Sequence, residues 1–182
     1  VAREAAGPVH SIAVLPFADM SPHKDQEHFC TGIAEEIINA LAGIDRLKVV
    51  SRMSSFQYRD LGGDTREIGR KLGVKTLLEG SVRKAGNQLR ITAQLIDAAD
   101  EKHLWSERYD RQLDDIFTIQ DDIAQSIVQA LQITLSPGES SALKHTLTDQ
   151  AVAYDFYLRG RQYFFRNSKR DHLYARQMFN RA

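Results

Sequence analysis

The clearest regularity in the chain is the alternation of apolar and polar residues between positions 74 and 97. In the second half of this stretch one side is apolar, comprising Leu89, Ile91, Ala93 and Leu95, and the other is polar, comprising Arg90, Thr92 and Gln94. A period of two residues is typical of a half-buried strand. Residues 76–83 alternate in the same way, and the pair Gly86-Asn87 between the halves suits a tight turn. The stretch therefore predicts an antiparallel β-hairpin.

Residues 11–49 carry both strand-like and helix-like patterns. The apolar run SIAVLPF at 11–17 predicts a strand buried on both faces, which ends at its proline. Isoleucines and leucines at 33, 37, 41 and 44 form one helical stripe, so we expect a helix over 31–42 that ends at Gly43. Glu35 and Glu36 are expected near its start, where carboxylates interact favourably with the positive end of the helix macrodipole. Residues 47–51 predict a second short strand.

Later segments complete the pattern. After a loop at Gly62-Gly63, Asp64 is expected to cap a helix that stops at Gly73. Residues 103–109 predict a third strand beside the hairpin, with Trp105 and Tyr109 on one face. Asp114 or Asp115 then begins a long helix. Its apolar stripe consists of Ile119, Ile123, Ile127 and Leu131.

This element order predicts an α/β fold over residues 11–135, a mixed β-sheet with helices packed on it. A new helix is expected at Ser136-Pro137, with serine as N-cap and Glu139 in its first turn. Aromatic residues are concentrated in two further helical segments, separated by Asn167-Ser168, with Asp171 able to cap the second. Residues 136–182 are therefore interpreted as a linker helix followed by a helix pair.

Composition narrows the classes of function. The chain has 24 Lys plus Arg and 24 Asp plus Glu among 182 residues, so no net charge directs it to nucleic acid or an anionic membrane. Its single cysteine, Cys30, excludes an intrachain disulfide. Apolar runs are too short for membrane insertion by this segment. Because the chain starts without methionine and stops inside a helical pattern, we expect it to be part of a longer protein.

Catalytic and metal-binding patterns were sought and not found. The six histidines lack metal-ligand spacing, and the acidic pairs are more typical of helix starts than of acid–base catalysis. Cys30 near His28 lacks a third orienting group, so a small buried residue is the favoured interpretation. Phosphate-binding glycine motifs and cyclase or kinase signatures are missing. We therefore expect no catalysis, metal or cofactor in this segment.

A polar surface is the remaining candidate for function. Residues 51–55 follow the second strand, where open α/β sheets bind ligands. One face of the hairpin is polar, and it is either solvated or a docking surface. The lone tryptophan is expected to be half-buried at the sheet end, with a partner anchor as the alternative. The candidate interaction surface comprises Arg52, Ser54, Ser55, Glu79, Ser81, Arg83, Arg90, Gln94 and Trp105.

Eight segments in unbroken order carry a family resemblance. They are SIAVLPFADMS, GIAEEIINAL, VVSRMSSF, REIGRKLGV, LLEGSVRKAG, LRITAQLIDAAD, HLWSERYDR and DIFTIQDDIA. This order closely resembles the TolB-like amino-terminal domain of bacterial multi-domain signalling proteins. The resemblance implies a small α/β domain, similar also to outer-membrane lipoproteins that activate peptidoglycan synthases.

The last helix pair resembles a tetratricopeptide repeat. Gly160 and Tyr163 match its first helix, and Ala175, Phe179 and Ala182 match its second. Repeats of this kind bury their faces on one another, so we expect the parent protein to continue with more repeats.

The resemblances lead to three hypotheses about function. The first is a non-catalytic sensory or interaction module that binds a protein, a peptide or an envelope component. The second is the regulatory part of a class III adenylate cyclase, and the third is part of a membrane-bound winged-helix transcriptional regulator. The resemblance implies a periplasmic segment of an inner-membrane protein, with a cytoplasmic location as the alternative, and a homodimer is compatible with the exposed hairpin edge.

Overall fold

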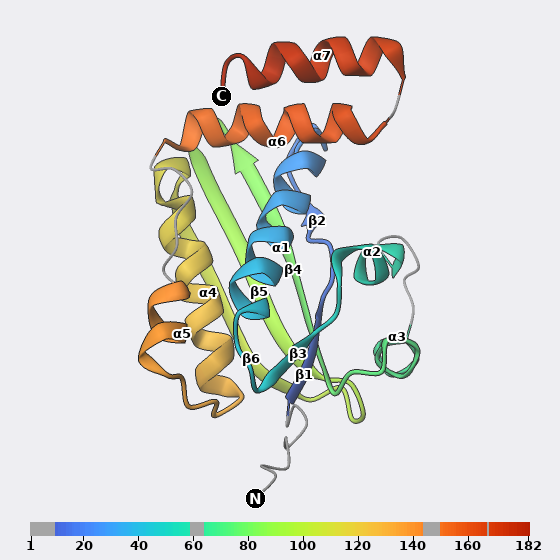
Figure 1. Ribbon diagram of the computed structural model, residues 1–182, viewed down its shortest axis with the longest axis vertical. Coiled ribbons are helices and arrows are strands. Elements are labelled where there is room, and N and C mark those ends of the chain that lie inside the picture. Colours follow the sequence, from blue (N-terminus) through green and yellow to red (C-terminus); the bar gives the residue numbers. More distant parts are fainter. Residues whose placement is uncertain (1–9, 59–63, 144–149, 167) are drawn as a thin grey trace, which may run out of the picture.

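The computed structural model describes residues 10–58, 64–143, 150–166 and 168–182. The Gly62-Gly63 loop and Asn167 lie outside this range. A mixed β-sheet forms the middle of the molecule, with strand order β3-β1-β4-β5-β6 and β2 added beside β4 (Figure 1). The strands are β1 (His10–Val14), β2 (Ala18–Asp19), β3 (Leu47–Val49), β4 (Thr76–Ala85), β5 (Gln88–Asp97) and β6 (His103–Gln112). The predicted fold class, a mixed sheet with helices packed on it, is confirmed.

The predicted hairpin is present as β4 and β5. The two strands pair antiparallel over ten residues each, from Thr76 opposite Asp97 to Ala85 opposite Gln88. Gly86 has a φ of 60°, which a glycine adopts without steric cost at the first position of a tight turn. The apolar side of β5 is buried, as its alternation predicts.

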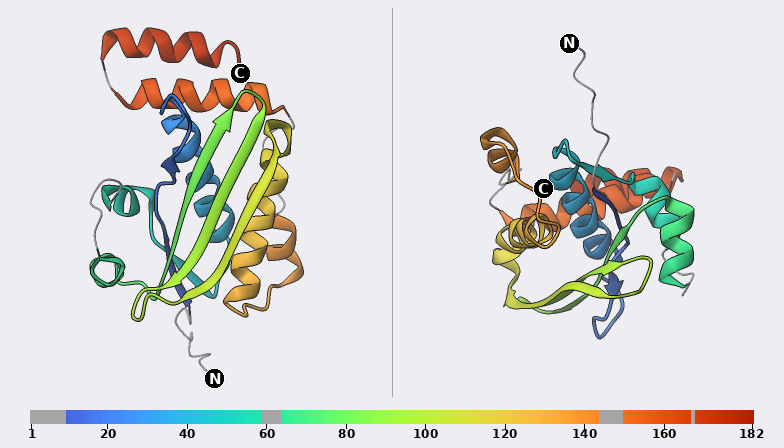
Figure 2. Two further views of the ribbon diagram at one scale, coloured as in Figure 1. Left: turned by 180° about the vertical axis from the view of Figure 1, so that it is seen from behind. Right: turned by 90° about the horizontal axis from the view of Figure 1, so that it is seen from below.

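Helices cover the two faces of the sheet unequally. α1 (Glu27–Ala42) and α4 (Ile116–Ala130) pack on one face and build the main hydrophobic core, in which Ile33, Ile91 and Ile123 are fully buried. On the opposite face α3 (Thr65–Leu72) packs through Ile68 against a smaller cluster around Leu77. The rest of this face has no described helix over it (Figure 2). We call this uncovered part of β4, β5 and β6 the open sheet face.

Several boundaries differ from the predictions. α1 begins at Glu27, four residues before the expected start. The sequence did not mark this start, because Gln26 at the N-cap position makes no side-chain cap. Glu35 and Glu36 therefore lie in the middle of the helix, and their predicted role at its first turn is wrong. β2 and the short helices α2 (Arg52–Ser55) and η1 (Phe56–Tyr58) were not predicted, since elements this short carry no periodic signal.

Helix caps follow the sequence more closely. Asp64 accepts a hydrogen bond from the backbone of Arg66 at the start of α3, and Gly73 ends that helix with a φ of 64°. Ser136 caps α5 (Pro137–Ala142) as predicted, and the Glu139 side chain also accepts a hydrogen bond from the backbone of Ser136. α4 follows a 3-10 turn, η2 (Leu113–Asp115), whose residue Asp115 accepts from the backbone of Gln112. The last helix is capped by Ser168 rather than by Asp171.

The carboxy-terminal helix pair lies across one end of the sheet (Figure 1). It consists of α6 (Ala151–Phe165) and α7 (Lys169–Phe179). α6 packs on α1, and its residues Tyr154 and Leu158 belong to the main hydrophobic core. A Cβ atom at Gly32 of α1 would lie 2.5 Å from the methyl groups of Leu158, so this glycine allows the two helices to approach closely. The helix pair is thus joined to the α/β layer by shared core.

Candidate functional site

Five of the predicted surface residues meet on the open sheet face. In the β4–β5 register Glu79 lies opposite Gln94, Ser81 opposite Thr92, and Arg83 opposite Arg90. Residues opposite each other on neighbouring antiparallel strands share a face, so the hairpin itself brings these side chains together. The alternation in the sequence was sufficient to predict this arrangement.

Arginines dominate the end of this face near the hairpin turn. Arg83 and Arg90 are like charges in directly opposite positions, an arrangement that by itself destabilises a sheet. Asp110 of β6 offsets part of the repulsion: its carboxylate lies 2.5 Å from Nε of Arg90 and 3.1 Å from Nε of Arg108. The hydrogen bond from Arg90 and the two guanidinium charges lower the pKa of Asp110. Two arginines therefore share one aspartate, and Arg83, Arg90 and Asp110 line a cavity of about 210 Å³.

The other predicted surface residues lie elsewhere. Trp105 is partly buried and packs on the main core, opposite Leu95, so it points away from the open sheet face. Ser55 is fully buried, and its expected place on an interaction surface is wrong. The chain enters α2 directly after β3, and this turn directs Ser55 inward. Ser54 is partly exposed, whereas Arg52 belongs to a different site.

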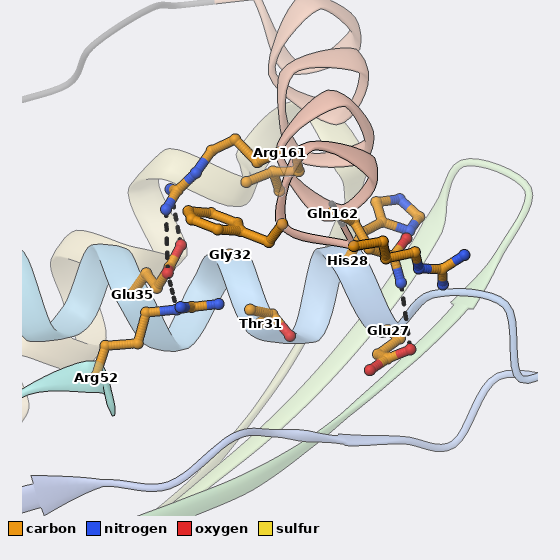
Figure 3. A pocket seen from close by; sticks show the side chains of 11 residues that line it. Glu27, His28, Thr31, Gly32, Glu35, Arg52, Arg161 and Gln162 are labelled. Atoms are coloured by element: carbon orange, nitrogen blue, oxygen red, sulfur yellow. Dashed lines mark hydrogen bonds and ion pairs between the residues drawn. The ribbon is translucent and has the colours of Figure 1, made fainter. Parts of the chain in front are cut away.

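That second site is a cavity of about 200 Å³ between α6 and α1, with Arg52 of α2 on its wall. We call it the junction cavity. Glu35, which is 6% exposed, lies on its wall and contacts guanidinium groups from two separate elements (Figure 3). Arg161 of α6 donates to both carboxylate oxygens at 2.7 and 3.1 Å, and Nε of Arg52 from α2 contacts Oε1. Two cations therefore share one buried anion.

A second buried carboxylate joins the same two layers. Asp155 of α6 lies 3.2 Å from Nε2 of His28, 3.3 Å from Nζ of Lys84 and 2.9 Å from Nε of Arg159. Burial alone raises the pKa of Asp155. The hydrogen bond from His28 and the charges of Lys84 and Arg159 outweigh that effect and lower the pKa to about 2. The carboxylate is therefore held ionised between α1, the end of β4 and α6.

Aromatic rings surround the arginines of the junction cavity. The guanidinium of Arg52 lies 4.9 Å from the ring centre of Phe56 and 5.2 Å from that of Phe165. Arg161 lies 5.8 Å from the Phe165 ring and 5.7 Å from the Tyr157 ring. Stacking on aromatic faces favours a guanidinium group and holds its plane in position. Phe165 is 58% exposed although it contacts both arginines.

The sequence contained a signal for this site that its apolar pattern obscured. His28, Thr31, Gly32 and Glu35 follow one another at helical spacing, so they form a polar stripe on α1 beside its apolar one. The partners of Glu35 come from positions 52 and 161, and only the tertiary fold brings them together. Within the described ranges, no three histidine, cysteine or acidic side chains are grouped as metal ligands would be. No described helix is long and apolar enough to cross a membrane.

Comparison with known proteins identifies the family. Residues 9–130 match the model of the second domain of HilA/YgeH-like transcriptional regulators. The chain belongs to this family. A relative of this HilA/YgeH-like chain, the Rhizobium meliloti (strain 1021) protein named "Putative adenylate cyclase 3", is 44% identical over 172 residues, which are 94% of this chain. The chain spans only 29% of that relative's length.

A solved structure shares the fold of the HilA/YgeH-like chain. TolB from Acinetobacter baumannii is similar over 67% of this chain and 28% of its own, with a TM-score of 0.52 and 16% identity. The LpoB C-terminal domain from Salmonella enterica is similar over 60% of this chain and 87% of its own, with a TM-score of 0.47 and 18% identity. The resemblance to TolB-like domains expected from the sequence is therefore confirmed at the level of the fold.

Proposed function

We propose that this chain is a non-catalytic regulatory module of a bacterial multi-domain signalling protein, and that it binds an acidic segment of a protein partner on the open sheet face. Membership of the HilA/YgeH-like regulator family supports a regulatory role. Another domain of the protein then carries out the chemical reaction or binds the DNA. Residues 136–182 serve as a linker and the start of a tetratricopeptide-like array.

One observation carries this proposal: three arginines lie on an uncovered sheet face with a single aspartate between them. Arg83, Arg90 and Arg108 project from β4, β5 and β6, and Asp110 pairs with the last two. Placing Arg83 opposite Arg90 costs stability in the free chain. A carboxylate from a partner offsets that cost on binding. Arginine suits a carboxylate because its planar guanidinium can donate two parallel hydrogen bonds to the two carboxylate oxygens.

The relative from Rhizobium meliloti favours one kind of parent protein over the other. This chain is 44% identical to 29% of a protein that is named as a cyclase. That similarity supports the proposal that the chain is a regulatory segment of an adenylate cyclase. A winged-helix regulator is the alternative, supported by the HilA/YgeH-like family itself. A periplasmic location, with the cytoplasm as the second choice, is part of the same proposal.

The docking surface is tested first by locating the partner. A photo-crosslinking amino acid replaces Thr92, which lies in the middle of the open sheet face, in the full-length protein inside the cell. The same amino acid at Glu107, on the neighbouring strand, serves as the control, because Glu107 points to the other face. The proposal predicts a crosslinked protein that is specific to position 92. Equal capture at both positions contradicts it.

The partner captured at position 92 is then purified, and its affinity for single variants is measured. Arg90→Glu should weaken binding by about tenfold or more, because the substitution reverses one charge in the contact. Arg111→Glu is the matched control, an exposed arginine on the same strand as Arg108 whose pairing with Leu89 places it on the other face. Unchanged affinity of Arg90→Glu refutes the assigned surface.

The non-catalytic part of the proposal has its own test. The purified chain is incubated with ATP or GTP and a divalent metal ion, and cyclic nucleotide and released phosphate are measured. We expect no product above the level of a heat-denatured sample. Product formation by the native chain would show that the chain itself carries an activity.

A further inference from the structure

The junction cavity has an excess of positive charge that its own residues do not balance. Glu35 carries one charge and lies between Arg52 and Arg161, whose side chains are 36% and 26% exposed. A third arginine, Arg166, lines the same cavity from the exposed end of α6. The other acidic residue of the wall is Glu27, whose carboxylate accepts a hydrogen bond from Gln162 at 3.2 Å.

The remaining polar groups of the cavity wall are mainly hydrogen-bond donors. Arg52 contacts Glu35 through Nε, and its terminal nitrogens extend over α1 toward Thr31 (Figure 3). The rings of Phe56 and Phe165 both contact this guanidinium, so its position is restricted before any ligand arrives. A preorganised guanidinium group in a partly enclosed site is a strong donor for an oxyanion.

We infer that the junction cavity, which Arg52 of α2 and Arg166 of α6 both line, binds a small oxyanion, a molecule with a phosphate or carboxylate group. The volume of about 200 Å³ is smaller than the roughly 300–1,000 Å³ of typical small-molecule pockets. It therefore suits a single anionic group or a compact anion better than a nucleotide. A cation is disfavoured because Glu35 and Glu27 already accept hydrogen bonds from the residues around them.

Such a ligand would join the α/β layer to the helix pair. Arg52 belongs to the segment that follows β3, whereas Arg166 caps the far end of α6. An anion in the cavity adds negative charge beside Arg52 and Arg161, which share the single carboxylate of Glu35, and it favours the docked position of α6. The site is separate from the open sheet face, so failure of one proposal would not contradict the other.

The test uses the purified chain with two probes, inorganic phosphate and citrate, at constant ionic strength adjusted with sodium chloride. Isothermal titration calorimetry and backbone amide NMR follow the binding. We expect saturable binding of at least one probe at millimolar concentration, with amide shifts centred on residues 27–35 and 158–166. Which probe binds distinguishes a phosphate from a carboxylate ligand. Absence of saturable binding of both overturns the inference.

Variants connect the binding to the named arginines. Arg52→Gln should weaken binding by about tenfold or more, the value of one charge-assisted hydrogen bond. Arg161 still holds Glu35 in this variant, so the fold should persist; if it does not, Arg166→Gln at an exposed position provides the same test. Arg70→Gln, at an exposed position of α3 outside both sites, is the control and should bind as the wild type does. Equal binding by all variants, or equal weakening by the control, also overturns the inference.

Discussion

Asp155 offers a direct measurement of how firmly the helix pair is held. In the folded chain its pKa is lowered from 3.8 to about 2, because His28, Lys84 and Arg159 together outweigh the opposing effect of burial. Each pH unit of displacement is worth about 1.4 kcal/mol, so the ionised carboxylate contributes about 2 kcal/mol to the free energy of unfolding. The side chain is only 12% exposed, so solvent screening reduces this value little.

The sign of the pH dependence follows from the direction of the shift. The folded chain binds its proton more weakly than the unfolded chain, so the contribution is complete above the ordinary pKa of 3.8 and is lost as the pH falls toward 2. Asp155→Asn removes the contribution at every pH. The stability difference between wild type and variant should therefore shrink by about 1.5 kcal/mol between about pH 5 and about pH 2.5.

The assay is urea denaturation followed by circular dichroism across that pH range, with the two proteins always compared at the same pH. At the upper end we expect Asp155→Asn to cost about 2–4 kcal/mol, since the substitution leaves Lys84, whose side chain is 11% exposed, without its anion. Asp110→Asn is the comparison: its exposed carboxylate also pairs with two arginines and has a lowered pKa, so it should show a smaller change in the same direction. The reasoning is refuted if the Asp155→Asn difference stays constant with pH, or if Asp110→Asn shows an equally large change.

Two further predictions concern the core. Gly69→Ala should lower the free energy of unfolding by about 1–3 kcal/mol in urea denaturation, because its Cβ would lie 2.4 Å from Cβ of Ala98, which cannot move without the backbone. Gly138→Ala is the control, because its Cβ would meet no atom within 4 Å and should cost little. Equal effects of the two substitutions would contradict the close approach at Gly69. Burial raises the pKa of both Tyr109 and Tyr154, so in an ultraviolet titration to about pH 11 two of the six tyrosines should stay protonated until the chain unfolds. Because the unfolded chain ionises first, stability should fall as the pH rises above 10; ionisation of all six tyrosines in the folded chain would contradict this.

The sequence predicted structure well where neighbours along the chain determine it. The hairpin and its polar face follow from alternation and a turn glycine, which are local features, and the caps at Asp64 and Ser136 follow from side chains that bond the backbone two or three residues away. The five hairpin residues of the candidate surface were therefore placed together correctly.

The junction cavity could not be predicted in this way, because its interactions connect distant positions. Glu35 was assigned to a helix start since the actual start has no capping side chain, and its partners are 17 and 126 residues away. Ser55 was expected at a surface because it follows a strand, but α2 directs it inward. Both errors arise from tertiary packing that overrides local pattern.

The shared core of α1, α4 and α6 has a consequence for how such proteins recombine in evolution. Tyr154 and Leu158 belong to the core beside α1, and the missing side chain of Gly32 leaves room for Leu158. A gene fusion that joined this α/β layer to a foreign helical array directly after α4 would expose apolar surface. It would also remove the α6 contacts of Lys84 and Arg52, which are Asp155 and Phe165. We therefore expect a stable fusion to keep this chain through α6 and to exchange sequence only beyond that helix.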